Sequence, residues 1–292
     1  MKTTPLGEAE PRQRRVAVGT FDGVHLGHRR VIDRNDTVLT FDPHPVAVVA
    51  PHAAPKLLTT LERKAELVEQ EGVEELVVIP FDRDFASRSA EDFVEHVLVE
   101  ALGATSVSVG ENFRFGHKAA GDAELLRADG RFEVHVEPLL EVDGEVVSSS
   151  HIRGLVLGGA VEYAGRLLGA PFMVTGEVVH GDERGRSLGF PTANLVPPDG
   201  YVVPGHGVYA AVADGVPAAV NVGVRPQFET GRGELIEAYL IDWDGDLYGQ
   251  KLRIEFLKRL RGERRFASVE ALVEQMGEDV RQAREVAGFA AG

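Results

Sequence analysis

The chain has 292 residues, of which 43% are hydrophobic and 26% are charged, and its formal net charge is −15. A single hydrophobic core usually stops growing at about 250 to 300 residues, so this length favours a globular protein of two domains. The negative charge disfavours general nucleic-acid binding, which relies on basic side chains facing phosphates. The absence of cysteine excludes disulfide bonds and thiolate metal sites.

The start of the chain is polar, and residues 1–15 are expected to form a loose leader rather than a signal peptide. Apolar runs such as Val46 to Ala50 are far too short to cross a bilayer, which takes about 20 residues. We therefore expect a cytoplasmic protein that binds neither membranes nor nucleic acids.

The first half of the chain alternates short β-branched segments with segments of helical periodicity. The predicted strands are 16–18, 37–40, 75–79 and 106–109, and the predicted helices are 61–71 and 90–102. Strands and helices in alternation predict a parallel sheet with helices on both faces. Sheets of this kind bind ligands beyond the carboxyl ends of their strands.

The pattern changes after about Phe172, beyond a short helical connector predicted at 155–168. Short strands then follow one another with turn signals between them. The next long helix is predicted after Ser268, its expected N-cap, with Val269 at the start of its apolar face. This pattern is typical of a small antiparallel barrel followed by a C-terminal helix.

A glycine-rich segment, residues 16–28, leads from the first predicted strand into a helix start. Its glycines allow close backbone approach, and the first amides of a helix favour an anion. His25 and His28 are three residues apart, so they share a helix face and can donate hydrogen bonds to a triphosphate, while Gly27 leaves room for a nucleobase or ribose. Two arbitrary histidines would more often be a structural pair, but their position here favours a nucleotide site.

This segment resembles the HxGH motif of nucleotidyltransferases, and more closely the GxFDGVHxGH form of bacterial bifunctional riboflavin kinase/FAD synthetases. Three later segments resemble motifs of that family in the same order: Thr40–Pro45 (TFDPHP), Gly110–Gly116 (GENFRFG) and Ser148–Arg153 (SSSHIR). One departure is the short span from Phe21 to Asp36, so the helix that presents His28 must be short.

The resemblance implies roles for residues of the first half. FMN would attack the α-phosphorus of ATP and expel pyrophosphate, and His25, His28 and Arg153 would be the catalytic residues. The expected ATP-binding residues are Gly19, Phe21, Asp22, Gly27, Ser149 and Ser150. The expected flavin-binding residues are Pro45, Asn112 and Arg114.

A second glycine-rich segment, residues 176–195, follows another strand start. A loop of this kind can surround phosphates with backbone N–H groups, although it contains no P-loop motif. Thr192 and Asn194 offer oxygen ligands two residues apart, which suit Mg²⁺ shared with ATP phosphates. A bare Thr-x-Asn would more often be a polar turn.

This half resembles the riboflavin kinase barrel, whose GFPTAN motif stands unaltered at Gly189–Asn194, with further matches at 207–210, 222–226 and 248–249. The resemblance implies that Glu237 is the catalytic base for the riboflavin 5′-hydroxyl and that Thr192 and Asn194 hold Mg²⁺. The ATP-binding residues expected here are Gly181, Gly185, Gly189 and Pro191. Apolar residues occur on both faces of the strand around Glu237, so alternation leaves its direction open.

We therefore expect a Rossmann-like α/β nucleotidyltransferase domain at residues 1–168 and an antiparallel β-barrel riboflavin kinase domain at 169–292. The predicted function is ATP- and Mg²⁺-dependent phosphorylation of riboflavin to FMN, releasing ADP, and adenylylation of FMN to FAD, releasing pyrophosphate. The alternatives are a kinase alone with an impaired first half, and a non-catalytic flavin- or nucleotide-binding regulator. The protein is expected to be a monomer or a weak homo-oligomer.

Overall fold

A computed structural model of the chain describes residues 1–180, 188–224 and 234–290. The chain divides into two compact units, Met1–Ser149 and Ser150–Gly292. Two units agree with the two-domain expectation from length and from the change of pattern along the sequence.

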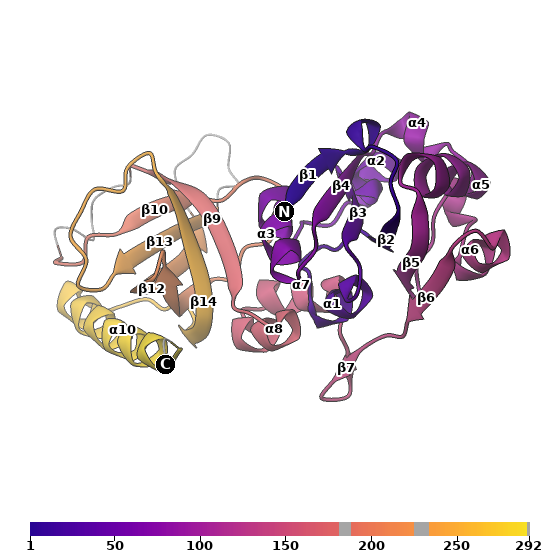
Figure 1. The fold of residues 1–292 in the computed structure, drawn as a ribbon. Helices are drawn as coiled ribbons and strands as arrows, with labels where there is room; N and C mark the ends of the chain where they lie inside the picture. The colour runs from indigo at the N-terminus through magenta and orange to yellow at the C-terminus, as the bar shows by residue number, and fades with distance from the viewer. Residues whose placement is uncertain (181–187, 225–233, 291–292) are drawn as a thin grey trace. The chain divides into compact units, whose positions relative to one another are not determined.

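The first unit is built on a six-stranded sheet in the order β1-β4-β3-β2-β5-β6, and every neighbouring pair is parallel (Figure 1). The strands are β1 (Lys2–Pro5), β2 (Arg14–Val18), β3 (Thr37–Asp42), β4 (Glu75–Pro80), β5 (Ala104–Gly110) and β6 (Glu133–Glu137). Valine, leucine and isoleucine dominate the central strands, which are buried on both faces as a parallel sheet requires. The predicted sheet is confirmed.

Helices cover the two faces of this sheet, and apolar clusters lie beneath them. The helices are α1 (Leu26–Ile32), α2 (Pro45–Val49), α3 (Leu61–Gln70), α4 (Arg83–Ala86), α5 (Ala90–Asp92), the π-helix η3 (Phe93–Ala101) and α6 (Ala123–Asp129). Short 3₁₀ turns occur at η1 (Leu6–Glu8), η2 (Pro51–Ala53) and η4 (His117–Ala119), and β7 (Glu141–Val142) pairs with β8 (Glu145–Val146). The helix after His25 is short, as predicted.

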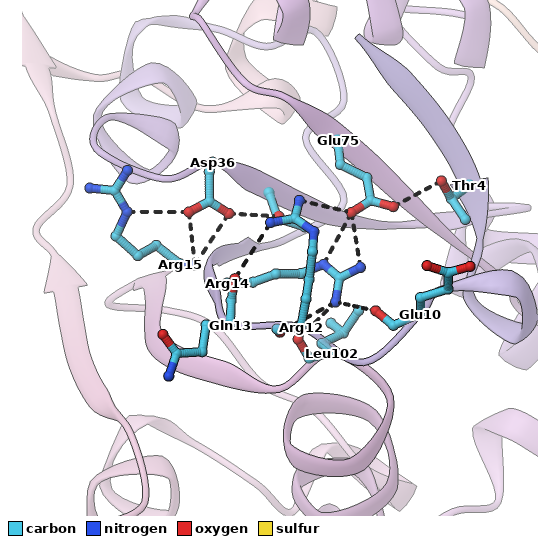
Figure 2. A network of polar contacts seen from close by, with 10 residues as sticks. Thr4, Glu10, Arg12, Gln13, Arg14, Arg15, Asp36, Glu75 and Leu102 are labelled. Atoms are coloured by element: carbon cyan, nitrogen blue, oxygen red, sulfur yellow. Dashed lines mark hydrogen bonds and ion pairs between the residues drawn. The ribbon is translucent and has the colours of Figure 1, made fainter.

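The expectation of a loose leader was wrong, because residues 2–5 form the edge strand β1, parallel to β4. Polar contacts hold this segment, which explains why it lacks an apolar pattern. Figure 2 shows Glu75 accepting from the Thr4 hydroxyl at 2.9 Å and from Arg14 Nε at 3.0 Å. Arg14 is buried and also donates to the Leu102 carbonyl at 2.9 Å. Burial alone would raise the pKa of Glu75, but these hydrogen bonds hold it below its ordinary value.

The topology decides where a site can form in this unit. The polar network of Figure 2 lies at the amino ends of β2, β3 and β4. The chain leaves β2 toward β3 on one side, whereas β5, on the other side of β2, leads to β6. Parallel sheets bind ligands at such a reversal, beyond the carboxyl ends of the strands. The segments after β2, β3 and β5 carry the predicted site residues of this unit apart from Ser149.

The second unit begins with two helices and continues as a closed antiparallel barrel in the order β10-β13-β12-β11-β14-β9. The predicted single connector at 155–168 is instead α7 (Ser149–Leu157) and α8 (Val161–Leu168), because Gly158 and Gly159 interrupt it, Gly159 with φ 81°. The barrel strands are β9 (Phe172–Val179), β10 (Ala193–Val196), β11 (Gly207–Ala213), β12 (Val216–Val224), β13 (Glu234–Leu240) and β14 (Lys251–Arg261).

A C-terminal helix, α10 (Val269–Ala290), packs against β11 and β12 of this barrel. The Ser268 hydroxyl accepts from the Ala271 N–H at 3.2 Å, so the predicted N-cap is confirmed. Val269 does not belong to the packed face, since it is 57% exposed, whereas Ala283 is fully buried against the barrel. The predicted order of a parallel sheet, a small barrel and a C-terminal helix is confirmed.

Candidate active sites

The turn after β2 has an unusual backbone. Phe21, Gly23 and Val24 all have positive φ, at 48°, 89° and 42°. A β-branched residue such as valine rarely adopts this conformation, and strained backbone of this kind clusters at functional sites. Tertiary contacts hold the turn: Asp22 Oδ1 accepts from the N–H of Leu58 at 2.8 Å and of Thr59 at 3.2 Å.

His25 and His28 meet at the end of this turn, as predicted. Their rings stack with centroids 3.5 Å apart, and the rings of His28 and Phe21 meet in a T-shaped contact with centroids 5.3 Å apart. His25 caps α1 by accepting the His28 N–H on Nδ1 at 3.2 Å. Because Nδ1 accepts, the ring proton of neutral His25 lies on Nε2, which is free to donate to a ligand. The amide of His28 is therefore used by the cap.

Both histidines are neutral at physiological pH. Burial lowers the pKa of His25 to about 4. Burial lowers the pKa of His28 well below its ordinary value, and electrostatic interactions with His25 and Lys64 lower it further. His28 Nδ1 is buried and has no hydrogen-bond partner among the described residues. An unpaired buried nitrogen costs stability unless something binds it, so it marks a place for a ligand atom or water.

Lys64 is a neighbour of this turn that motif comparison missed. It lies on α3 and is only 8% exposed. Its Nζ donates to the Thr20 carbonyl at 2.7 Å and to the Thr40 hydroxyl at 3.3 Å. Burial lowers its pKa to about 8, although Asp22 and Asp42 raise it. The available signal was a lysine on the same helical face as Leu67 and Val68, both of which are buried.

Other predicted residues of the first half fall into three groups. Gly19 and Gly27 pack tightly, since a Cβ would lie 3.0 Å from the Phe21 ring and 3.3 Å from the His25 ring, respectively. The Ser149 hydroxyl donates to the Asp22 carbonyl at 2.9 Å, which joins that serine to the turn. Ser150 is exposed, and Arg153 lies one helical turn after Ser149 on α7, within the second unit.

The predicted flavin-binding residues follow two other strands of the sheet. Pro45 begins α2 just after β3, and His44 caps that helix by accepting the Val46 N–H at 3.2 Å. Asn112 is exposed in the turn after β5, and Arg114 forms an ion pair with Asp122 at 3.3 Å. These residues and the histidine pair therefore share the carboxyl edge of the sheet.

In the barrel, three polar residues lie side by side on adjacent strands. Glu237 of β13 is directly opposite Asn194 of β10 on one side and Asn221 of β12 on the other. Asn221 Nδ2 donates to Glu237 Oε2 at 3.1 Å. Ile236 and Ala238 are fully buried, so Glu237 points away from the barrel interior, which settles the direction that alternation left open. Sequence comparison missed Asn221, whose signal is its place just before the 222–226 match.

The GFPTAN segment leads into this row of polar residues. Gly189, with φ 87°, and Pro191 are exposed, and Thr192 is half-buried just before β10. Phe190 contacts the ring of Tyr239, with centroids 5.4 Å apart and a 71° angle between the planes. Gly181 and Gly185 lie outside the described residues. Among those described, no group of three or more histidine, aspartate or glutamate side chains could hold a metal ion.

Comparison with known proteins identifies both halves. Residues 7–151 match the FAD synthetase family, and residues 168–287 match the riboflavin kinase family. The bifunctional riboflavin kinase/FMN adenylyltransferase of Bacillus subtilis is 39% identical over 289 residues, covering 92% of this chain and 90% of that protein. The protein of the same name from Escherichia coli K12 is 37% identical over 292 residues, covering 94% of this chain and 93% of the relative.

A solved structure shows the same fold over nearly the whole of both chains. The crystal structure of a macrolide-efflux protein from Streptococcus pneumoniae is 31% identical, with a TM-score of 0.89, and the match covers 97% of this chain and 99% of that one. Among the described residues of the present chain, no helix has the length and apolar character needed to span a membrane.

Both enzyme domains are thus present, and the predicted bifunctional organisation is favoured over a kinase alone or a non-catalytic regulator. Membership implies ATP-dependent transferase chemistry with riboflavin, FMN and FAD. The chain belongs to the family of bifunctional riboflavin kinases/FMN adenylyltransferases, with an FAD synthetase domain followed by a riboflavin kinase domain.

Proposed function

We propose that the barrel transfers the γ-phosphoryl group of ATP to riboflavin, and that the parallel-sheet unit transfers AMP from a second ATP to the FMN produced. The observation that carries this proposal is that each half brings together its own group of polar side chains: the stacked His25 and His28 after β2, and the row of Asn194, Glu237 and Asn221 in the barrel.

In the adenylyl transfer, a phosphate oxygen of FMN attacks the α-phosphorus of ATP, and the bond to pyrophosphate breaks. No covalent protein intermediate is needed, because positioning and charge stabilisation suffice. Neutral His25 offers its Nε2–H to a phosphate oxygen, and His28 offers a buried ring nitrogen that has no partner among the described residues. Arg153 supplies a permanent positive charge for the departing pyrophosphate.

In the kinase reaction, Glu237 takes the proton of the riboflavin 5′-hydroxyl as its oxygen attacks the γ-phosphorus, and ADP leaves. Asn221 donates to Oε2 of Glu237 and so fixes the plane of the carboxylate. The other oxygen, Oε1, then faces the substrate as the base. A half-buried carboxylate on the outer surface of the barrel can be reached by a flavin without any opening of the barrel core.

The residues next to Glu237 fit a magnesium ion. Asn194 is buried directly opposite Glu237, and its side-chain oxygen, like the Thr192 hydroxyl, is the hard ligand that Mg²⁺ prefers. Mg²⁺ usually relies on few protein ligands and on substrate phosphates, which agrees with a pair of neutral oxygens rather than a carboxylate cage. When bound there, the ion would neutralise charge on the ATP phosphates.

The proposal is tested by incubating the protein with riboflavin, ATP and Mg²⁺ and separating the flavins by chromatography over time. FMN should appear first and FAD after it, and FMN supplied alone should give FAD and pyrophosphate. A protein that stops at FMN lacks the proposed adenylyl transfer, and one that uses only supplied FMN lacks the proposed kinase.

Three further predictions belong to this proposal. The functional boundary is placed at residues 168/169, which the start of the riboflavin kinase match at residue 168 supports. The enzyme works in the cytoplasm on small molecules, without binding nucleic acid. It is a monomer or a weak homo-oligomer, which sedimentation across a range of concentrations can measure.

A further inference from the structure

A buried lysine supports the strained turn after β2. Lys64 Nζ donates to the Thr20 carbonyl at 2.7 Å and to the Thr40 hydroxyl at 3.3 Å. The Thr40 hydroxyl in turn donates to the same Thr20 carbonyl at 3.1 Å. The three groups therefore close a small hydrogen-bonded ring that joins α3, the end of β3 and the first residues of the turn.

This lysine stands where an apolar residue would be expected. It occupies the packed side of α3, alongside Leu67 and Val68. Burying an ammonium costs free energy, whereas leucine or methionine at such a position would gain it. Perturbed ionisable groups in clefts are a mark of functional sites. The contacts of Lys64 are directed at Thr20, immediately before the turn residues with positive φ.

Charged and titratable groups surround Lys64. Asp22 and Asp42 are the acidic groups that face it, and His28 is close enough for the lysine charge to lower its pKa. Because His25 and His28 are neutral, they bring hydrogen-bond donors but no charge to the ATP phosphates. A fixed ammonium behind them supplies positive potential where negative charge develops.

We propose that Lys64 is a positioning residue of the adenylyl-transfer site. Lys64 holds the Thr20 carbonyl and so keeps the turn from Phe21 to His28 in the shape that receives the ATP phosphates. It also places a positive charge near the neutral histidine pair. This inference rests on the proposed adenylyl transfer. It does not involve the barrel, so riboflavin phosphorylation by the same protein serves as an internal control.

The test compares Lys64→Met, which keeps the volume but removes the charge and the donors, with Lys64→Arg, which keeps the charge. Lys2→Met is the matched control, because Lys2 is an exposed lysine of the same sheet. It lies at the amino end of β1, whereas the proposed site lies beyond the carboxyl ends of the strands. At pH 7, Lys64→Met should lower kcat/KM for ATP in FMN adenylylation by about 10- to 100-fold, the scale of a lost charged hydrogen bond. Lys64→Arg should recover much of this loss.

The pH profile separates positioning by a charge from mere packing. The ammonium is present below its pKa of about 8 and is lost as pH rises through that value. Since kcat/KM reports the ionisations of the free enzyme, wild-type kcat/KM for ATP should fall as pH rises through about 8. This fall of kcat/KM near pH 8 (the alkaline limb of the profile) should be absent from Lys64→Met and should move to higher pH in Lys64→Arg. The kinase reaction of each variant should stay within twofold of wild type.

The inference is overturned if Lys64→Met keeps both wild-type FAD synthesis and the limb near pH 8. If Lys64→Met does not fold, the inference is tested by the pH profile of wild-type kcat/KM for ATP and by FAD synthesis in Thr40→Val. A wild-type profile without the limb, or Thr40→Val with unchanged FAD synthesis, also overturns it. A wild-type protein that makes no FAD from FMN would instead refute the proposed function itself.

Discussion

The two candidate sites place their polar groups in opposite ways. After β2, His25 and Lys64 are both buried, so the site is assembled from ionisable groups whose pKa values burial has lowered. In the barrel, Glu237 stands on the outside of a closed sheet whose interior is apolar. Substitutions in the first site should therefore change stability and pH dependence together with activity, whereas substitutions in the second should change activity with little effect on folding.

The largest expected effects come from removing single donors proposed for the adenylyl transfer. Arg153→Ala and His28→Ala should each slow FAD formation from FMN by roughly 10² to 10³, since a charge-stabilising contact in the transition state contributes about 2 to 4 kcal/mol. Riboflavin phosphorylation should stay within a few-fold of wild type. Steady-state assays of the two reactions on the same preparation measure both.

These variants also test whether the sites are separate. His28 Nδ1 has no partner among the described residues, so His28→Ala breaks no hydrogen bond of that atom within the described protein. If a folded variant lost both activities, the two reactions would share one ATP site. If neither variant lost FAD synthesis, the first unit would not be the adenylyltransferase.

The next largest effect is expected from Glu237→Gln, and it should be confined to the kinase reaction of the barrel. Glu237→Gln keeps the shape of the side chain but removes the base, so FMN formation should fall by about 10²-fold. Adenylylation of supplied FMN should be unchanged. The free energy of unfolding should change by less than about 0.5 kcal/mol, because the residue lies outside the apolar core. Near-normal kinase turnover would leave Glu237 a structural carboxylate.

A third prediction concerns stability, where the first site should differ most from the barrel. The pKa of His25 is lowered from 6.5 to about 4, so the unfolded chain binds more protons between these values. The stability that neutral His25 contributes is therefore fully present above about pH 6.5 and is lost as pH falls through about 4. Between pH 7 and pH 5 this single group should remove about 2 kcal/mol of unfolding free energy.

His25→Asn is the variant for this measurement, because asparagine can still cap α1 but does not titrate. The unfolding free energy of the variant should fall about 2 kcal/mol less than that of wild type over the same pH range. All five tyrosines and Trp243 follow residue 149, so fluorescence reports the second unit, while far-UV circular dichroism reports both. A pH dependence that is equal in the two proteins would contradict the neutral, buried state of His25.

Motifs and periodicity were sufficient where local sequence decides structure. Alternating strands and helices predicted the parallel sheet, and the spacing of His25 and His28 predicted that they would meet on one helix face. Asp214 and Gly215 form the turn between β11 and β12, where short strands with turn signals between them were predicted, and both residues have the positive φ that hairpin turns require. In each case neighbouring residues carry the information.

What sequence could not supply depends on contacts between distant segments. Residues 2–5 look like a loose leader because their partner is Glu75, far along the chain. Lys64 looks like a surface lysine until α3 is packed against the ends of β2 and β3. Asn221 becomes a neighbour of Glu237 through the register between β12 and β13.

The smallest predicted effect concerns that last contact. Asn221→Ala should lower kcat of riboflavin phosphorylation by roughly fivefold, the equivalent of about 1 kcal/mol for one hydrogen bond to a partly exposed carboxylate. KM for riboflavin should change little, because Asn221 acts on the orientation of Glu237. A double-mutant cycle isolates this coupling: once Glu237→Gln has removed the base, adding Asn221→Ala should have almost no further effect on kcat. Additive losses would mean that Asn221 contacts substrate or ATP independently of Glu237, and the barrel site would then be more extensive than a single carboxylate held by its neighbour.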